Sequence, residues 1–221
     1  MNDGVLVIDK PAGISSAAVV GRIKRTLPRG TKVGHAGTLD PFATGVLVIL
    51  IGKATKLAEQ FMSQPKQYIA TIKLGATTRT LDTESEEIVT EGAVAAGIER
   101  IKELLPRFVG EIEQKPPAYS ALKIEGRPAY KLAREGRPVE LAARKVKVYG
   151  IEVVRYEWPE LEVKIDCGRG TYVRSLARDI GEALGVGGYL TVLRRTRVGE
   201  CRIEQAIGLD QVSVEKIRRL A

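Results

Sequence analysis

Hydrophobic and polar positions along the chain follow two periods, which predicts a mixture of strands and helices. Apolar runs and strict alternation predict strands, whereas apolar residues three or four positions apart predict helices. The expected strands are 4–10, 46–51, 67–75, 145–158, 160–168 and 189–199. The expected helices are 17–27, 54–62, 94–105 and 172–185, with a polar, acidic loop at 75–92. The run VLVILI at 46–51 is apolar throughout, which is typical of a strand buried on both faces.

Adjacent strand signals often have no helix between them, and this decides the expected fold class. The segments 145–158 and 160–168 are separated only by Pro159, which predicts an antiparallel pair. The pattern therefore favours an α+β fold in which helices flank a mixed, largely antiparallel sheet. No internal repeat or convincing linker interrupts it, so we expect a single catalytic domain over 1–221. A proline-rich, basic segment at about 115–145 is expected to form an inserted protrusion with a short helix.

A glycine-bounded loop, GHAGTLDPFATG at 34–45, precedes the predicted buried strand. Its glycines allow close backbone approach, and His35 and Asp40 come from the same short loop. An Asp-Pro pair can simply initiate a turn. A carboxylate on a loop anchored by a rigid strand is, however, a common arrangement in functional sites. The nearby GKAT at 52–55 fails the phosphate-loop pattern, because Leu47 and Ala54 occupy positions that require Gly and Ser or Thr.

Composition and charge indicate which kind of partner the protein binds and whether it has a membrane segment. The formal net charge is +8, and it is unevenly spread: residues 119–150 carry eight Lys and Arg against three Glu, while 82–113 carry nine acids against three basic residues. Such polarity favours a polyanionic partner such as nucleic acid, although a merely solvated surface is the alternative. No apolar run reaches the ~20 residues of a membrane span, and the N-terminus does not resemble a secretory signal. We therefore expect a cytoplasmic protein without a membrane segment.

Cysteine and histidine usage argues against a structural metal. The chain has two cysteines, Cys167 and Cys201, and one histidine, His35, which is too few for a zinc site. A disulfide between the cysteines is possible, but the chain is too large and too cysteine-poor for a disulfide scaffold. We expect no metal.

Several longer motifs occur in a fixed order through nearly the whole chain. They are GVLVIDKPAGISS, GHAGTLDPFATGVLVILIGKATK, KQYIATIKLGATT, QKPPAYSALKIEGRPAYKLAREG, GTYVRSLARDIGEALG and YLTVLRRTRVG. In these motifs the chain resembles the bacterial tRNA pseudouridine synthase B family, whose members isomerise the T-loop uridine at tRNA position 55. The GHAGTLDP block is long and specific. The resemblance implies the pseudouridine synthase fold, with 115–145 as a thumb-like insertion that grips the T-arm.

Carried over position by position, the resemblance implies the catalytic residues. Asp40 matches the catalytic aspartate, Tyr68 the tyrosine that stacks on the target uracil, and Arg174 the arginine that pairs with the catalytic carboxylate. The implied reaction breaks the N1–C1′ bond, turns the uracil and rejoins it through C5, so it requires no cofactor. A guanidinium beside Asp40 would oppose the effect of burial and keep the carboxylate charged.

The resemblance also implies residues that bind the RNA. Tyr172 and Leu193 match positions that contact the flipped nucleotide, and His35 matches the histidine that helps to extrude the base. Lys10 matches a lysine of the N-terminal block, more plausibly structural than catalytic. Asp82 matches an acid that contacts the T-loop, less securely because Ser85 stands where the family usually has glycine. The candidates for phosphate contacts are Lys123, Arg127, Lys131 and Arg134.

One further departure and two alternatives accompany this interpretation. Family members usually continue into a small C-terminal RNA-binding module of the PUA type, which we expect to be absent from this chain. We expect a monomer that acts on the tRNA T-arm. One alternative is an RNA-binding or tRNA-folding protein with secondary isomerase activity. The other is the related synthase that works with a guide RNA on ribosomal RNA, against which the bacterial-type thumb insertion argues.

Overall fold

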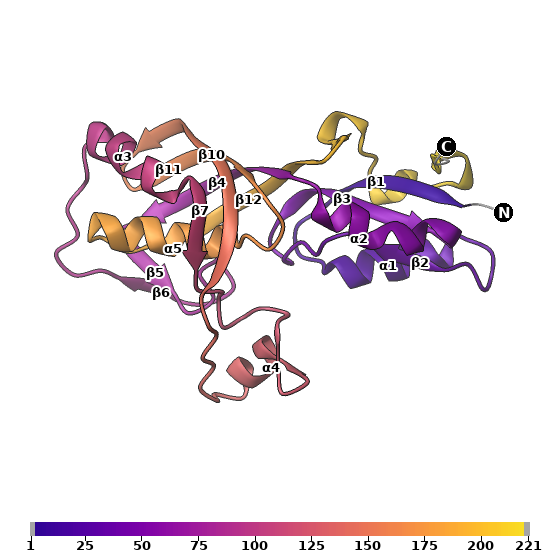
Figure 1. The fold of residues 1–221 in the computed structure, drawn as a ribbon, viewed down its shortest axis with the longest axis horizontal. Helices are drawn as coiled ribbons and strands as arrows, with labels where there is room; N and C mark the ends of the chain where they lie inside the picture. The colour runs from indigo at the N-terminus through magenta and orange to yellow at the C-terminus, as the bar shows by residue number, and fades with distance from the viewer. Residues whose placement is uncertain (1–2, 219–221) are drawn as a thin grey trace. The chain divides into compact units, whose positions relative to one another are not determined.

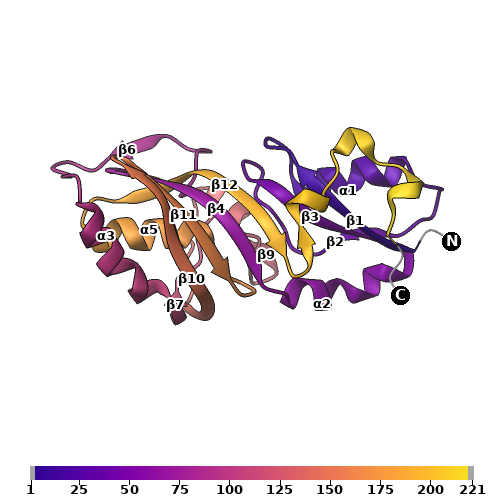
Figure 2. The ribbon, with the colours of Figure 1, turned by 90° about the horizontal axis from the view of Figure 1, so that it is seen from above.

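The computed structural model describes residues 3–218, and within these the chain forms two compact units. Unit 1 comprises Met1–Ile69, Asp166–Arg169 and Val192–Ala221, and unit 2 comprises Ala70–Ile165 and Gly170–Thr191. The ribbon is shown in Figure 1, and Figure 2 shows it from above. The described residues form a mixed α+β structure with a largely antiparallel sheet, as the sequence pattern predicted.

The sheet of unit 1 is built around the apolar strand β3 (Thr44–Ile51), which is buried from Gly45 onward. The strand β1 (Gly4–Lys10) pairs with it antiparallel along its whole length. On β3, the strand β12 (Gly188–Val198) pairs in parallel near Thr44, and β2 (Val33–His35) pairs antiparallel near Ile51. Because β3 has neighbours along both edges and covered faces, its uninterrupted hydrophobic sequence is explained.

Helices of unit 1 begin where the sequence supplies a polar cap or a sharp turn. Helix α1 (Ser16–Arg25) starts at Ser15, whose side chain accepts a hydrogen bond from the amide of Ala18. Ser15 is therefore the N-cap, and Ser16 lies inside the helix. The segment expected as one short helix consists of a 3₁₀ turn at Gly52–Leu57 followed by α2 (Ala58–Ser63).

The strand order in the sheet continues as β12-β4-β11-β10-β7. Unit 2 contains β10 (Arg144–Glu157), β7 (Gly110–Gln114) and most residues of β4 (Lys66–Leu74) and β11 (Glu160–Cys167). Helix α5 (Val173–Leu184) is amphipathic and ends at Gly185, which adopts the left-handed conformation of a helix C-cap. Helix α3 (Ile98–Leu104) buries Ile101 and Leu104.

The predicted protrusion is formed by a small ribbon and a helix. Strands β8 (Lys123–Ile124) and β9 (Arg127–Pro128) pair antiparallel, and α4 (Ala129–Arg134) follows directly. In Figure 1 this segment stands away from the strands of unit 2. We call residues 115–145 the thumb segment.

Several short strands were not predicted from the sequence. The segment expected to be a loop at 75–92 contains the two-stranded ribbon β5 (Ala76–Thr78) and β6 (Glu87–Val89), so that expectation was wrong in part. β6 is exposed at every position and therefore lacks the alternation that marks a half-buried strand. Strand β2 was also missed, because three residues are too short for a periodic signal. β7 was missed as well, because Ile112 is the one apolar side chain among its five residues.

Helix α3 is shorter than expected, because it begins at Ile98 after Gly97 rather than at Val94. Further 3₁₀ turns occupy Leu105–Phe108, Ile203–Gln205, Leu209–Gln211 and Val214–Lys216, and β13 (Cys201–Arg202) pairs with β12. Among residues 3–218, no helix combines the length and the apolar character that crossing a bilayer requires.

Candidate functional site

The glycine-bounded loop at 34–45 lies in unit 1 and connects β2 to β3. Its backbone turns at Gly37 and Gly45, which have φ angles of +96° and +100°, in the region that favours glycine. The amide of Ala36 donates to the carbonyl of Val48, so the first part of the loop is hydrogen-bonded to β3. Asp40 is half-buried within this loop.

Two buried polar side chains hold the residues on either side of Asp40. The Ser16 hydroxyl accepts a hydrogen bond from the Leu39 amide (2.9 Å) and donates to the Leu39 carbonyl (3.0 Å). The Lys10 ammonium donates to the carbonyls of Pro11 and Ile14 (both 2.8 Å) and of Pro41 (3.1 Å). Residues from β1 and α1 therefore fix the backbone immediately before and after Asp40.

A third buried side chain, Arg195 on β12, binds the same loop. It is 1% exposed. Its Nε donates to the Val46 carbonyl (2.7 Å), while its terminal nitrogens donate to the carbonyls of Gly37 (3.1 Å) and Thr38 (3.4 Å). The guanidinium lies near enough to the phenol of Tyr68, on β4, to influence its pKa. One side chain thus binds the loop of Asp40 and the start of β3, and it interacts electrostatically with Tyr68.

The electrostatic environment in unit 1 is rich in cations. Burial, with the charge of Arg195 adding to it, lowers the pKa of both Lys10 and Lys66 to about 8, and the carboxylate of Asp40 opposes this shift at Lys10. Burial and Arg195 likewise lower the pKa of His35, which favours its neutral form. Burial raises the pKa of the Tyr68 phenol, which therefore stays protonated at neutral pH.

Five of the predicted residues lie in unit 1, and they are Lys10, His35, Asp40, Tyr68 and Leu193. Asp40 lies near enough to Lys10 and to Tyr68 to shift the pKa of both. Lys10 is fully buried, and its hydrogen bonds show a structural contribution to the loop. The Nδ1 atom of His35 is buried without a hydrogen-bond partner among the described residues.

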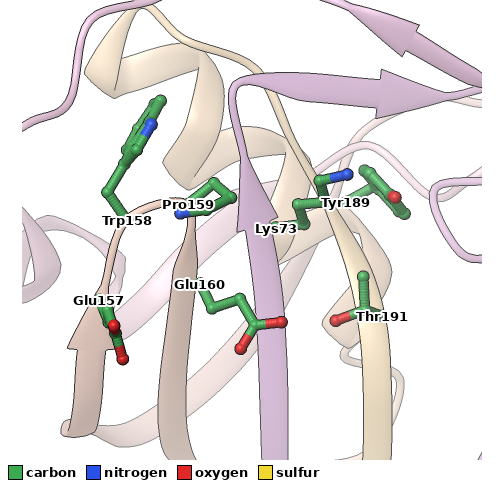
Figure 3. Close-up of a pocket in the computed structure, with 7 residues that line it drawn as sticks. All are labelled: Lys73, Glu157, Trp158, Pro159, Glu160, Tyr189 and Thr191. Atoms are coloured by element: carbon green, nitrogen blue, oxygen red, sulfur yellow. The ribbon is translucent and has the colours of Figure 1, made fainter.

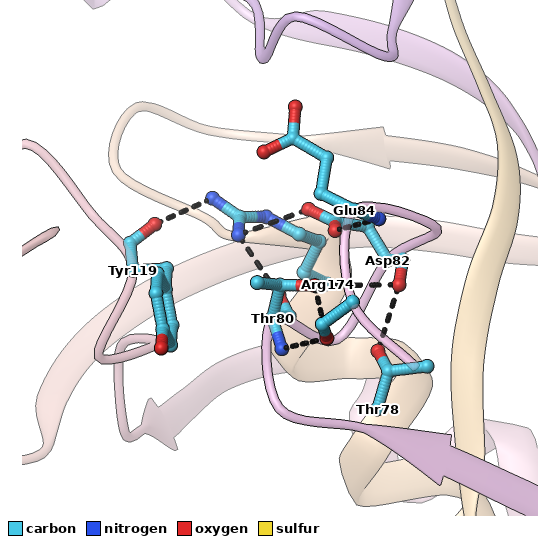
Figure 4. A network of polar contacts seen from close by, with 7 residues as sticks. Thr78, Thr80, Asp82, Glu84, Tyr119 and Arg174 are labelled. Atoms are coloured by element: carbon cyan, nitrogen blue, oxygen red, sulfur yellow. Dashed lines mark hydrogen bonds and ion pairs between the residues drawn. The ribbon is translucent and has the colours of Figure 1, made fainter. Parts of the chain in front are cut away.

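The predicted residues Arg174 and Asp82 lie in unit 2 and interact there (Figure 4). Arg174 Nη1 is 3.2 Å from Asp82 Oδ2, and both side chains are almost completely buried. The Arg174 guanidinium also donates to the carbonyls of Thr80 (2.9 Å) and Tyr119 (3.0 Å). Asp40 belongs to unit 1, so the predicted pair between Arg174 and Asp40 stays a prediction.

The loop that carries Asp82 is held by its own polar contacts. The Thr78 hydroxyl donates to the Asp82 carbonyl (2.7 Å), and Asp82 Oδ1 accepts from the Glu84 amide (3.0 Å). Ser85 Oγ accepts from the Thr80 amide (3.1 Å) and lies 2.9 Å from the Thr80 hydroxyl. Ser85 therefore stabilises the conformation in which Asp82 pairs with Arg174.

Tyr172 lies in unit 2, directly before α5. Its backbone exchanges two hydrogen bonds with the buried side chain of Gln114, at 2.8 and 3.1 Å. The Arg144 guanidinium lies 5.1 Å from the centre of the Tyr172 ring, within the range of a cation–π contact. The ring is therefore held between the start of α5 and a cation of β10.

The four basic residues predicted to contact RNA phosphates all lie on the thumb segment and are exposed, and they are Lys123, Arg127, Lys131 and Arg134. Arg127 forms an ion pair with Glu135 at 2.6 Å, and the Arg134 guanidinium lies 5.7 Å from the ring of Tyr130. Exposure leaves their charges available to a polyanion, but no contact of the structure tests that role.

A pocket of about 520 Å³ in unit 2 contains none of the predicted site residues (Figure 3). It is lined by Lys73, Glu157, Trp158, Pro159, Glu160, Tyr189 and Thr191. Across residues 3–218, no group of three or more His, Cys, Asp or Glu side chains is placed to hold a metal ion.

Sequence reasoning missed Arg195 and Ser16, the two side chains that hold the loop most directly. The sequence did contain a signal for Arg195. It lies two positions after Leu193, so both side chains point to the same, inward face of β12. A charged residue at an inward position of a strand is expected to have a specific partner, and such positions indicate a functional or structural network.

The chain matches two domain families that together cover most of its length. The description "TruB family pseudouridylate synthase (N terminal domain)" matches residues 24–173, and "tRNA pseudouridylate synthase B C-terminal domain" matches 174–219. A protein named tRNA pseudouridine synthase B from Mycobacterium tuberculosis is 50% identical over 95% of this chain and 72% of its own length. The protein of the same name from Phocaeicola vulgatus is 47% identical over 96% of both chains.

The fold is also similar to that of solved structures. A chain of a Cbf5-Nop10-Gar1 complex is 34% identical with a TM-score of 0.73, and the match covers 96% of this chain and 54% of that one. A chain of an H/ACA RNP bound to a substrate RNA is 31% identical with a TM-score of 0.71, over 97% of this chain and 53% of that one. The present chain spans about half the length of these two solved chains. The matched domains and the identity to these relatives show that the chain belongs to the TruB family of pseudouridylate synthases.

Proposed function

We propose that the protein is a tRNA pseudouridine synthase that isomerises the T-loop uridine at position 55, with Asp40 as its catalytic carboxylate. The observation that carries this proposal is the arrangement around the loop at 34–45. Three buried polar side chains bind its backbone, namely Ser16, Lys10 and Arg195. Several buried polar side chains around one short loop are expected where a carboxylate must be held in a fixed position for catalysis. The names of the relatives supply tRNA as the substrate.

In this proposal Asp40 and Tyr68 have different chemical roles. Asp40 acts as an anion, either by attacking the nucleoside or by removing a proton from the ribose, and the cations around it favour its ionised form. The phenol of Tyr68 stays neutral and offers a flat ring against which the uracil stacks. The base is detached at N1, turned and rejoined at C5, a rearrangement that balances without any added group.

Recognition of the T-arm is assigned to residues of both units. A uridine in a folded loop must be swung out before it can react, and His35, Tyr172 and Leu193 are proposed to contact the extruded nucleotide or the space that it leaves. The basic thumb segment is proposed to bind phosphates of the T-arm. Arg174 is proposed to act together with Asp40, in addition to its contact with Asp82.

The decisive experiment is chemical mapping of pseudouridine in an unmodified T-arm transcript treated with the protein alone. Wild-type protein should convert one uridine, and Asp40→Asn should form none while still binding the transcript. The matched control is Asp166→Asn, which removes another carboxylate of unit 1, one that pairs with Arg197 at 2.7 Å. This control should retain activity, and pseudouridine formation by Asp40→Asn would refute the assignment.

A guide-dependent synthase is the second candidate, and the similarity to a chain of an H/ACA RNP is the observation in its favour. The greater identity to proteins named tRNA pseudouridine synthase B makes it the weaker candidate. Conversion of bare transcript without any guide RNA separates the two. A protein that binds or folds tRNA would remain active in a folding assay after the Asp40→Asn substitution, so both roles can coexist.

A further inference from the structure

Arg195 has an environment that differs from that of its neighbours on β12. Arg194 and Arg197 are partly exposed and pair with the carboxylates of Asp9 and Asp166. Arg195 is buried, and its guanidinium donates hydrogen bonds to backbone carbonyls. Burying a guanidinium is costly, so these bonds indicate that it has a specific task at this place.

The acceptors of Arg195 belong to the loop that carries Asp40 and to the strand that follows this loop. The carbonyls of Gly37 and Thr38 lie three and two residues before Asp40, and the Val46 carbonyl fixes the same guanidinium to β3. Any displacement of the guanidinium would therefore move the loop of Asp40 relative to β3.

We propose that Arg195 is a positioning residue for pseudouridine formation, which fixes the loop that carries Asp40 through one planar, multidentate guanidinium. A guanidinium presents several donors in a fixed plane, whereas an ammonium is a single point. The function of Arg195 consequently depends on its geometry and not on its charge alone. This inference rests on the proposed catalytic role of Asp40.

The test compares Arg195→Lys and Arg195→Met with the wild type on a T-arm transcript. Single-turnover reactions with saturating protein give the rate constant of the reaction, and circular dichroism of the same samples shows whether the protein is folded. A displacement of about 1 Å at a catalytic group costs on the order of 10²-fold in rate. We expect a loss of that order for Arg195→Met and roughly tenfold for Arg195→Lys, which keeps the charge but loses the planar set of donors. The circular dichroism spectrum should match that of the wild type, and KM from steady-state reactions should stay within about twofold.

The matched control is Arg197→Met, two positions further along the same strand. It removes an arginine whose partner, Asp166, is partly exposed, and its rate constant should equal that of the wild type within about twofold. If Arg195→Met does not fold, Arg195→Lys decides the question. A wild-type rate constant in Arg195→Lys would overturn the proposal.

Failure of the proposed function gives a different result. If the wild type forms no pseudouridine in the transcript, or if Asp40→Asn is active, the proposed function is wrong. If Asp40→Asn is inactive but Arg195→Met reacts at the wild-type rate, the proposed function stands and only the positioning role of Arg195 is refuted.

Discussion

Substitution of Gly45 by alanine tests how closely β3 must approach β12 to place Arg195. Gly45 has a φ of +100°, and a Cβ atom at this position would lie 2.2 Å from the carbonyl oxygen of Arg195. Ordinary contact begins at 3.4 Å, so the two strands would have to separate by about 1.2 Å. Both atoms at this contact are fixed to backbone, which leaves no flexible side chain to absorb the displacement.

The expected cost has two parts. A non-glycine residue in the left-handed region costs about 1–2 kcal/mol. Overpacking of a buried contact adds about 1–3 kcal/mol. For a chain of this size, 1 kcal/mol corresponds to a fall in Tm of roughly 2–4 °C, so Gly45→Ala should lower Tm by roughly 4–20 °C. The displacement of Arg195 should also slow pseudouridine formation by about 10²-fold, because the loop of Asp40 moves with it.

Gly30→Ala isolates the first part of this cost. Gly30 also lies in unit 1 with a φ of +85°, but the Cβ that alanine would add there has no atom within 4 Å. Gly30→Ala should therefore lose only the stability that the left-handed backbone conformation costs, and its activity should be normal. Thermal unfolding followed by circular dichroism, together with initial rates on the T-arm transcript, measures both effects. Equal losses of Tm in the two variants, with activity intact in Gly45→Ala, would refute the close approach.

Three further substitutions test other features of the structure. Gly21→Ala, at an exposed position of α1 with no atom within 4 Å of the added Cβ, should raise the free energy of unfolding by about 0.5–1 kcal/mol in urea titrations. Lys66 has a pKa near 10.5 in the unfolded chain and about 8 in the folded protein. Between these pH values the unfolded chain binds the proton more tightly, so the free energy of unfolding rises with pH. Lys66→Met should reduce this rise, measured as urea midpoints from about pH 8 to about pH 10.5. Ser85→Ala removes two contacts to Thr80 and should cost about 1–3 kcal/mol, with faster hydrogen exchange at the Thr80 amide; unchanged exchange would contradict the role assigned to Ser85.

The elements that the sequence predicted well are those with a strong local period. β3 is apolar over its last six positions and is buried along them, and α5 combines helical spacing with a glycine C-cap. β5 and β6 could not be predicted in this way. They are three residues long, and β6 buries nothing, so their pairing depends on the neighbouring chain and not on a hydrophobic pattern of their own.

The candidate site residues came from motifs and not from the hydrophobic pattern. The resemblance supplied Asp40, Tyr68 and Arg174, each from a separate block of sequence. It did not supply Arg195, although that residue lies within the motif YLTVLRRTRVG. The role of Arg195 depends on the parallel pairing of β12 with β3, where Arg195 lies opposite Gly45, about 150 residues away in sequence. No local pattern reports such a pairing, since it is decided by the packing of the whole sheet.

The loop of Asp40 illustrates how polar side chains can fix a short segment more closely than apolar ones. Apolar packing is non-directional and tolerates small displacements, whereas a hydrogen bond loses strength steeply when its angle or length changes. Ser16, Lys10 and Arg195 each bind loop backbone at a different point, so a displacement at Asp40 would distort several bonds at once. Buried cations raise the cost of folding, and the depressed pKa of Lys10 is a sign of that cost. In the proposed mechanism, the side chains that fix the loop also place positive charge near the carboxylate that takes part in the reaction.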